Sequence, residues 1–496
     1  VQGYSPGLRC VLAQDPIVLA RHPEPPHAFE VIYAPLLFAS HPPRPQELWS
    51  AERKVIMHLL AKHPYALFVF SGVEGQLWDL VSFVPPGRQA GRLLLRRIVV
   101  DPYRGLRFAA QRLALLKFPG PGCAEGEPTA QKTLQRLEQA FSTEAVATEF
   151  LRGFHRLASD LQADLVRDQL NSGQALCRAY AFLSRLLMLC LVQSRGWLGK
   201  PFHFLSELWQ SYSRDGTAPD TFVADWLHAG LFRVLNGAEP VNLPASLSKA
   251  IAALPQFPTG WFGFEHSSGA RLHAIRDARY EQAMAYMEGY DFSAEESTPF
   301  DQVVGITPAM LGDVHQHLLA SLSGAQRKGV GAFYTPPIEI DLMCRLAVVD
   351  WMSKHLGSEH ERLLYQAVLA SDPYEQERAD TLLAARGLWP SLQRLLSGAR
   401  ILDPACGSGS FLVGMLQVLE DLQARASAHS GAGKQPPGGA ARPGVSCPYG
   451  VDAAGWAVAT ARARLWLQLM GAAALEPAEP EAAELWAKIC RRVRRG

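Results

Sequence analysis

The feature that most constrains the fold is the order of four segments near the carboxyl end of the chain. Arg400–Asp403 predicts a short buried strand, and Cys406–Gly409 is a tight turn with two glycines. Ser410–Ala426 has helical spacing, and Cys447–Asp452 predicts a second strand. This order is typical of the first βαβ unit of a doubly wound sheet in an α/β protein. A further helix is expected from about Trp456 to Met470.

The run from Asp403 to Leu412 holds the residues that would meet a ligand in such a unit. The strand brings Asp403 to its carboxyl end, and Gly407 and Gly409 allow the backbone to approach a ligand closely. The amino end of the following helix faces the same crevice, where it stabilises anionic groups. The run lacks the Lys-Ser/Thr pair of the loops that cradle nucleoside triphosphates, so it predicts a different kind of cofactor site.

This run, Asp-Pro-Ala-Cys-Gly-Ser-Gly-Ser-Phe-Leu, resembles motif I of S-adenosylmethionine-dependent adenine-N6 DNA methyltransferases. Gly331–Pro336 resembles the upstream motif X of that family, and Thr307–Gly312 resembles the helix that leads into it. Tyr449–Asp452 resembles motif II. Less specifically, Leu186–Leu198 is similar to the helical middle segment of large type IIG restriction–modification enzymes. Methyltransferase subunits of BREX-type phage-defence systems have a similar arrangement.

The resemblance implies that this region binds S-adenosylmethionine. In the family, motif X helps to enclose the methionine end of the cofactor. The glycine turn holds its amino-acid portion, and the acid of motif II accepts hydrogen bonds from its ribose. Carried over residue by residue, these cofactor-binding roles fall on Phe333, Tyr334, Thr335, Pro336, Asp403, Ala405, Gly407, Gly409 and Asp452. No residue is assigned a catalytic or a metal-binding role.

Simpler interpretations of single residues stay open. Asp452 can cap the helix that follows it, and Tyr334 can be a packing residue. Cys406 is more typical of a small buried thiol than of a nucleophile. Asp452 follows Gly409 by 43 residues, against roughly 20 in dinucleotide sites. The Gly/Pro/Ala-rich segment Ser430–Pro443, read as a flexible insertion, explains much of that excess.

In the family that the chain resembles, adenine-N6 transfer needs a second element, an Asn/Asp-Pro-Pro-Tyr/Phe loop that holds the flipped adenine. This tetrapeptide does not occur in the sequence; Asp101-Pro-Tyr103 and Asp372-Pro-Tyr374 lack the second proline and precede motif I. We therefore expect an incomplete or split DNA adenine-N6 methyltransferase of a restriction–modification or phage-defence system. The expected partners are double-stranded DNA and a second polypeptide that carries the missing loop and a target-recognition domain. The alternative is a non-catalytic cofactor- or DNA-binding subunit.

Three domains are expected along the chain. Residues 1–125 have the pattern of a mixed α/β domain, residues 126–296 are mostly helical, and residues 297–496 hold the Rossmann-like methyltransferase half-fold. Pro119–Pro128 is a Pro/Gly-rich break that suggests the first boundary. The strands of the first domain are expected at Ala66–Phe70, Trp78–Phe83 and Arg92–Val100.

Composition excludes several classes of protein. The chain has 48 Lys+Arg and 47 Asp+Glu, so a polycationic protein is excluded. Its eight Cys form no Cys-x-x-Cys pair, which predicts neither a zinc ribbon nor a disulfide framework. No segment approaches the roughly 18 uninterrupted apolar residues of a membrane span. The first twenty residues lack the pattern of a secretory signal, so a cytoplasmic protein is expected.

Three further motifs favour structural roles. Glu52-Arg-Lys54 has the Glu-x-Lys spacing of many metal-dependent restriction nucleases, but it lies in a helix-like stretch. His315 and His317 are two residues apart on a helix, so they lie on different faces and are poorly placed to chelate one metal. Arg491–Arg495 could contact phosphate, but a solvated basic helix end is the interpretation that we favour.

Overall fold

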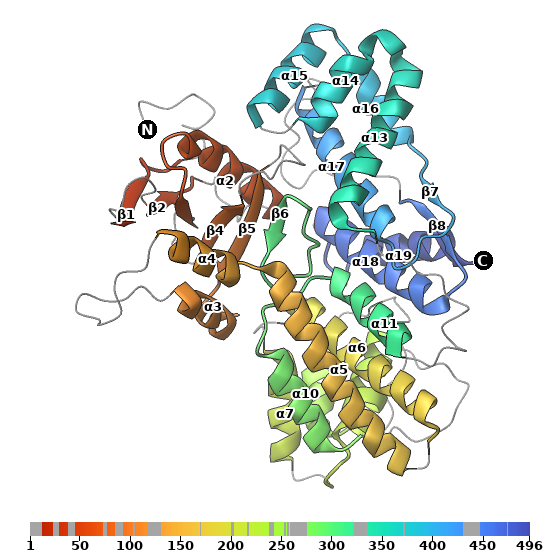
Figure 1. The fold of residues 1–496 in the computed structure, drawn as a ribbon. Coiled ribbons are helices and arrows are strands. Elements are labelled where there is room, and N and C mark those ends of the chain that lie inside the picture. Colours follow the sequence, from red (N-terminus) through yellow and green to blue (C-terminus); the bar gives the residue numbers. More distant parts are fainter. Residues whose placement is uncertain are drawn as a thin grey trace. The chain divides into compact units, whose positions relative to one another are not determined.

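The computed structural model describes residues 12–22, 29–37, 45–72, 77–84, 93–102, 105–116, 130–168, 170–199, 203–215, 218–237, 243–251, 254, 257, 275–321, 335–370, 373–429, 447–473 and 475–496 (Figure 1). By spatial contact the chain forms two compact units. Unit 1 comprises Val1–Val146, Ser297–Gly305 and Arg345–Trp389, and unit 2 comprises Ala147–Glu296, Ile306–Cys344 and Pro390–Gly496. The three domains expected from the sequence stay a prediction.

Unit 1 is built on a mixed six-stranded sheet with the strand order β1-β2-β3-β4-β5-β6. The β2–β3 and β5–β6 pairs are parallel, and the other three pairs are antiparallel. The three strands expected in the first domain are confirmed as β3, β4 and β5. The bounds are β1 (Ile17–His22), β2 (Phe29–Pro35), β3 (Ala66–Ser71), β4 (Trp78–Val84), β5 (Leu94–Val100) and β6 (Asp301–Val303).

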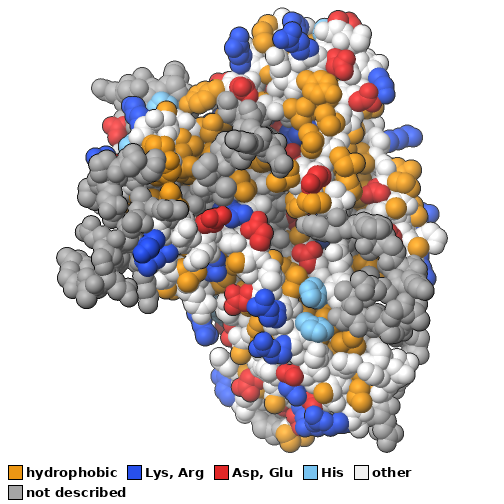
Figure 2. Space-filling model, in the orientation of Figure 1, with side chains coloured by type: hydrophobic (Ala, Val, Ile, Leu, Met, Phe, Trp, Pro, Cys, Tyr) orange, Lys and Arg blue, Asp and Glu red, His pale blue; other side chains and the backbone are white. Residues whose placement is uncertain are grey.

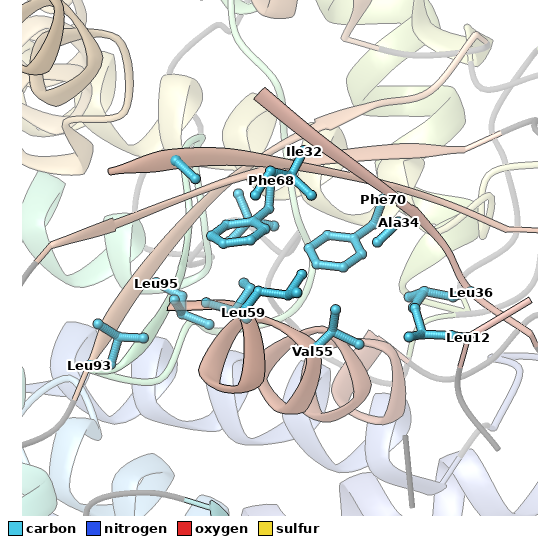
Figure 3. Close-up of a cluster of buried hydrophobic side chains, with 13 residues drawn as sticks. Leu12, Ile32, Ala34, Leu36, Val55, Leu59, Phe68, Phe70, Leu93 and Leu95 are labelled. Atoms are coloured by element: carbon cyan, nitrogen blue, oxygen red, sulfur yellow. The ribbon is translucent and has the colours of Figure 1, made fainter. Parts of the chain in front are cut away.

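An apolar core joins this sheet to helix α2 (Pro45–Leu60), as Figure 3 shows. Phe68 and Phe70 are two residues apart on β3, so their rings leave the same face of the sheet. Both rings lie toward the helix, where Val55 and Leu59 meet them, and all four side chains are buried. Burial of these large apolar groups is the main term that stabilises the unit.

The other helices of unit 1 cover shorter stretches, and three described helices contain residues of both units; the third, Trp389–Gly398, has only its first residue in unit 1. The expected helix over residues 106–116 is confirmed as α3 followed by one 3-10 turn. The bounds are α3 (Leu106–Leu113), η1 (Ala114–Leu116), α4 (Ala130–Ala140), η4 (Ser358–His360), α14 (Glu361–Leu369) and α15 (Pro373–Ala385), with α5 (Thr143–Arg167) and α13 (Pro337–Leu356) running across the boundary.

The first part of unit 2 is helical, as the sequence predicts. Its elements are α6 (Ser172–Ser194), α7 (Phe204–Arg214), the π-helical stretch η2 (Phe222–Phe232), α8 (Arg233–Leu235), α9 (Ala245–Ile251), α10 (Asp277–Met287) and α11 (Ala309–Ser321). Among the described helices, α6 has the length and apolar composition of a membrane span, but 83% of its most apolar window is buried inside the protein. A core helix has the same properties.

The last part of unit 2 contains a small parallel sheet with the order β7-β8-β9. The expected strand, glycine turn, helix and strand are all present, which agrees with the α/β fold class. That this sheet belongs to a doubly wound, Rossmann-like methyltransferase half-fold stays a prediction. The bounds are α16 (Trp389–Gly398), β7 (Leu402–Asp403), α17 (Ser410–His429), β8 (Tyr449–Asp452), α18 (Gly455–Ala473), α19 (Pro480–Arg492) and β9 (Val493–Arg495).

Two expectations about this region are wrong. The strand near residue 400 was expected to be buried, but Leu402 is 64% exposed, and β7 is an edge strand of the described sheet. The basic carboxyl end was expected to be a solvated helix end. Helix α19 instead stops at Arg492, and Val493–Arg495 adds a third parallel strand beside β8, with the Val493 side chain fully buried.

Some predicted features lie outside the described residues. These are the Pro/Gly-rich break at Pro119–Pro128, the insertion at Ser430–Pro443, and the first four residues of the motif X resemblance, Gly331–Tyr334.

Candidate cofactor site at the glycine turn

The glycine turn connects the carboxyl end of β7 to the amino end of α17. Cys406 N donates to Val451 O of β8 over 2.9 Å, and Gly409 N donates to Cys406 O over 2.8 Å. The parallel pairing of β7 and β8 places the ends of both strands at one edge of the sheet. Asp403 and Asp452, the last residues of these strands, therefore flank the same turn.

Both glycines of the turn have positive φ angles, 53° at Gly407 and 89° at Gly409. Residues that carry a Cβ atom rarely adopt this conformation. The surroundings of the two glycines differ. A Cβ atom on Gly409 would lie 3.0 Å from the Cα and Cβ of Ala461, because α18 packs directly against the turn. A Cβ atom on Gly407 would meet nothing within 4 Å. The turn is thus closely packed on its α18 side and open at Gly407.

Asp403 combines a structural hydrogen bond with a half-buried charge. Its Oδ1 accepts a hydrogen bond from Ala405 N over 3.0 Å. Burial raises the pKa of its carboxyl group, and the nearby negative charge of Asp452 raises that pKa further. The two carboxylates are therefore close enough to interact electrostatically, and a positive charge between them would be stabilised.

Asp452 accepts two backbone hydrogen bonds. Its Oδ2 accepts from Gly407 N over 2.9 Å, which ties the glycine turn to β8. Its Oδ1 accepts from Ala454 N over 2.8 Å, just before α18 begins at Gly455. The geometry therefore supports the simpler interpretation of Asp452 as a residue that holds the start of the next helix. A carboxylate offers about four lone-pair positions, so two remain for a ligand.

Cys406 has the environment of a buried thiol. Burial raises the pKa of its thiol group to about 12, and the charges of Asp403 and Asp452 act in the same direction. A thiol with such a pKa stays protonated near neutral pH, and the thiolate is the nucleophilic form. This supports the interpretation of Cys406 as a packing residue.

The motif X resemblance is only partly described, since Phe333 and Tyr334 lie outside the described residues. Thr335 and Pro336 directly precede α13, and Pro336 O accepts a hydrogen bond from Ile340 N over 3.1 Å. The first turns of α13 pack on α17, since a Cβ on Gly414 would lie 2.8 Å from Cγ2 of Ile340. The structure therefore places the first turns of α13, which follow Thr335 and Pro336, against α17.

Sequence reasoning missed the buried charges behind the glycine turn. Arg464 of α18 is 4% exposed and Glu296 is 8% exposed, and the two form an ion pair. Arg464 also donates hydrogen bonds to Ser408 and Ser410. The available signal was a pair of arginines, Arg462 and Arg464, in the mostly apolar stretch of α18.

A second buried charge cluster lies in unit 1, around Glu52. Helix α2 places Glu52 in the interior and Lys54 at the surface, so the two do not share one site. Arg97 of β5 donates from Nη1 to Glu52 Oε2 over 2.5 Å. Burial raises the pKa of Glu52 well above its ordinary value, and the carboxylate of Asp79 on β4 adds to this shift. No local pattern in the sequence indicates that Asp79, downstream of Glu52, interacts with it.

The remaining motifs have local partners. His315 stacks on Trp456 of α18, with ring centroids 5.2 Å apart and an interplanar angle of 6°. The ring of His317 instead lies 6.2 Å from that of His155 on α5, so the two histidines do face different neighbours. At the carboxyl end, the Arg492 guanidinium lies 4.6 Å from the ring centroid of Tyr449.

Comparison with known proteins finds similarity both in sequence and in structure. The chain is 23% identical over 297 residues to a protein of Methanocaldococcus jannaschii described as a type II restriction enzyme and methyltransferase. It is also similar, with a TM-score of 0.41 and 18% identity, to the type IIL restriction–modification enzyme MmeI in complex with DNA, over 68% of this chain and 37% of that one. No family model matches.

The sequence match covers only part of each protein. The sequence match covers 59% of this chain and 25% of the relative, so the chain spans about a quarter of that relative's length. The chain is thus similar to part of a restriction–modification protein that includes a methyltransferase.

Proposed function

We propose that the glycine turn of unit 2 binds S-adenosylmethionine and that the chain is part of a restriction–modification DNA methyltransferase. The observation that carries this proposal is the pair of carboxylates, Asp403 and Asp452, at the ends of two adjacent parallel strands on either side of Gly407. The similarity to a restriction enzyme and methyltransferase supports the same assignment.

The charge of the site favours this cofactor over a phosphate-containing one. S-adenosylmethionine carries a positive sulfonium and a positive amino group. The two carboxylates stabilise such charges, as the raised pKa of Asp403 beside Asp452 indicates. A pyrophosphate would meet repulsion from both. The open space at Gly407 provides room beside the turn, where a ligand can approach the backbone.

The chain's own residues would share the binding. The unused carboxylate oxygen of Asp403 would accept a hydrogen bond from the ligand's amino group, and the free lone pairs of Asp452 would accept from ribose hydroxyls. Ala405, Gly407 and Gly409 would line the amino-acid portion through backbone atoms. When bound, the cofactor supplies an electrophilic methyl group on its sulfonium.

The motif X segment completes the proposed site. Phe333, Tyr334, Thr335 and Pro336 would enclose the methionine end, and this assignment rests on the resemblance in sequence alone.

We further propose that the acceptor is the N6 amino group of adenine in double-stranded DNA, with a second polypeptide or segment supplying the Asn-Pro-Pro-Tyr loop. On the face seen in Figure 2, Lys and Arg side chains are interspersed with Asp and Glu, so the described residues there form no single basic patch. The second candidate function is a non-catalytic cofactor-binding subunit, which the missing tetrapeptide favours.

Calorimetric titration tests the cofactor assignment directly. The purified chain should bind S-adenosylmethionine, whereas NAD⁺ and ATP at the same concentrations should give no saturable heat. Binding of NAD⁺ or ATP in preference to S-adenosylmethionine would contradict the proposal.

A further inference from the structure

A buried ion pair lies against the glycine turn, where α18 packs on it. Arg464 Nε donates to Glu296 Oε1 over 2.5 Å, and Arg464 Nη2 donates to Glu296 Oε2 over 2.7 Å. The side chains are 5% and 7% exposed. Two parallel hydrogen bonds of this kind fix the plane of the guanidinium as well as its position.

The remaining nitrogen of the guanidinium reaches the turn. Arg464 Nη1 donates to Ser408 O over 2.9 Å, to Ser408 Oγ over 3.3 Å and to Ser410 Oγ over 3.0 Å. Ser408 lies between the two glycines, and Ser410 is the first residue of α17. One side chain thus joins the carboxylate of Glu296 to both the turn and the start of the helix.

Neighbouring elements leave this arrangement little freedom. Glu296 O accepts a hydrogen bond from Gln417 Nε2 of α17 over 3.4 Å. On α11, a Cβ atom on Gly312 would lie 2.7 Å from Ser408 Oγ, so the helix backbone touches the serine. Asp313 of the same helix senses both charges: burial raises the pKa of its carboxyl group to about 6, Arg464 opposes the rise, and Glu296 adds to it.

We infer that Arg464, oriented by Glu296, is a positioning residue that holds the glycine turn in the conformation that binds the cofactor. The inference rests on the proposed function, because the conformation that Arg464 holds is the one proposed to bind the cofactor. Asp452 holds Gly407 N from the strand side, and Arg464 holds Ser408 from the helix side. With both sides fixed, the two glycines keep their positive φ angles before a ligand arrives, so less conformational entropy is lost on binding.

Lysine cannot replace arginine in this role. Lysine offers a single ammonium group, which cannot pair with both Glu296 oxygens and reach the turn in the same geometry. Arg464→Lys keeps the positive charge beside Glu296 and so preserves most of the buried pairing, but it releases Ser408 and Ser410. The double variant Ser408→Ala/Ser410→Ala changes the acceptors instead of the donor. It leaves the ion pair intact and removes both hydroxyl acceptors.

The test measures S-adenosylmethionine affinity by calorimetry and thermal unfolding without ligand, at about pH 7.5 so that Asp313 stays mainly ionised. Four proteins are compared: the unaltered chain, Arg464→Lys, the double serine variant, and the triple combination. Ser397→Ala is the matched control, because Ser397 is an exposed helical serine whose Oγ bonds to Gln393 O on α16.

We expect Kd to rise about tenfold in Arg464→Lys, which corresponds to about 1.4 kcal/mol. In the double serine variant, Kd should rise at least about threefold, with little change in unfolding temperature. The triple variant should bind no more weakly than Arg464→Lys, since both changes break the same contact. Ser397→Ala should bind like the unaltered chain.

The outcomes separate this inference from the proposed function. If the unaltered chain binds S-adenosylmethionine and all variants bind it equally, the positioning role is wrong and the cofactor site stands. Additive losses of affinity in the triple variant would also contradict the positioning role of Arg464, because the arginine and the serines would then act independently. If the unaltered chain does not bind the cofactor, the proposed function fails and this inference falls with it.

Discussion

The two glycines of the turn should respond very differently to the same substitution. In Gly409→Ala the methyl group would lie 3.0 Å from the Cα of Ala461, a backbone atom that cannot move without shifting α18. Overpacking of this kind costs about 1–3 kcal/mol, and the left-handed conformation adds about 1–2 kcal/mol for an L-residue. The smaller entropy of the unfolded alanine chain offsets about 0.4–1 kcal/mol. At the middle of these ranges the net loss is about 3 kcal/mol.

In Gly407→Ala the new methyl group meets open space, so only the backbone term remains and the net loss is about 1 kcal/mol or less. The same methyl group projects into the space proposed for the cofactor, so this variant should keep its fold and lose affinity for S-adenosylmethionine. Urea unfolding followed by tryptophan fluorescence measures the first effect, and calorimetry measures the second. Equal stability of the two variants would refute the packing argument.

Three other results are expected. Burial raises the pKa of Glu420 from 4.5 to about 7; because the folded state prefers the protonated acid, stability falls as pH rises through this range. Between about pH 5.5 and about pH 8.5, ionisation of this group lowers the free energy of unfolding by about 2 kcal/mol. Glu420→Gln should abolish this loss, as measured by hydrogen exchange in α17 and α18. The control Glu484→Gln, at an exposed position, should leave the loss unchanged. Arg97→Met should destabilise unit 1 by about 3–5 kcal/mol in urea unfolding, because Glu52 and Asp301 lose a fully buried partner; a change below about 1 kcal/mol would contradict this. The purified chain alone should transfer no tritiated methyl groups to mixed-sequence DNA, and robust transfer would mean that the catalytic loop lies within this sequence.

The sequence predicted the elements around the turn because their signals are local. Two glycines between a short apolar run and a helical pattern indicate a turn that needs positive φ angles, and Gly407 and Gly409 have them. Hydrophobic periodicity likewise predicted β3, β4, β5 and the long helices. These features depend on residues that are neighbours in the chain.

The parts that were missed depend on residues far apart in the chain. Glu296 and Arg464 are 168 positions apart, and Arg97 and Asp301 are 204 apart. No local pattern indicates which buried arginine meets which carboxylate. The strand β9 was missed for a related reason: three residues after a helix carry no periodicity, and only pairing with β8 makes them a strand.

The most direct test of the cofactor site is the affinity of Asp403→Asn for S-adenosylmethionine. The asparagine keeps an oxygen to accept the hydrogen bond from Ala405 N, so the turn should stay folded while the negative charge is lost. We predict that calorimetric titration at neutral pH gives an affinity at least about tenfold weaker than that of the unaltered chain, with unchanged thermal unfolding. Equal affinity of the two proteins would contradict the central claim that the Asp403 carboxylate binds the cationic part of the cofactor.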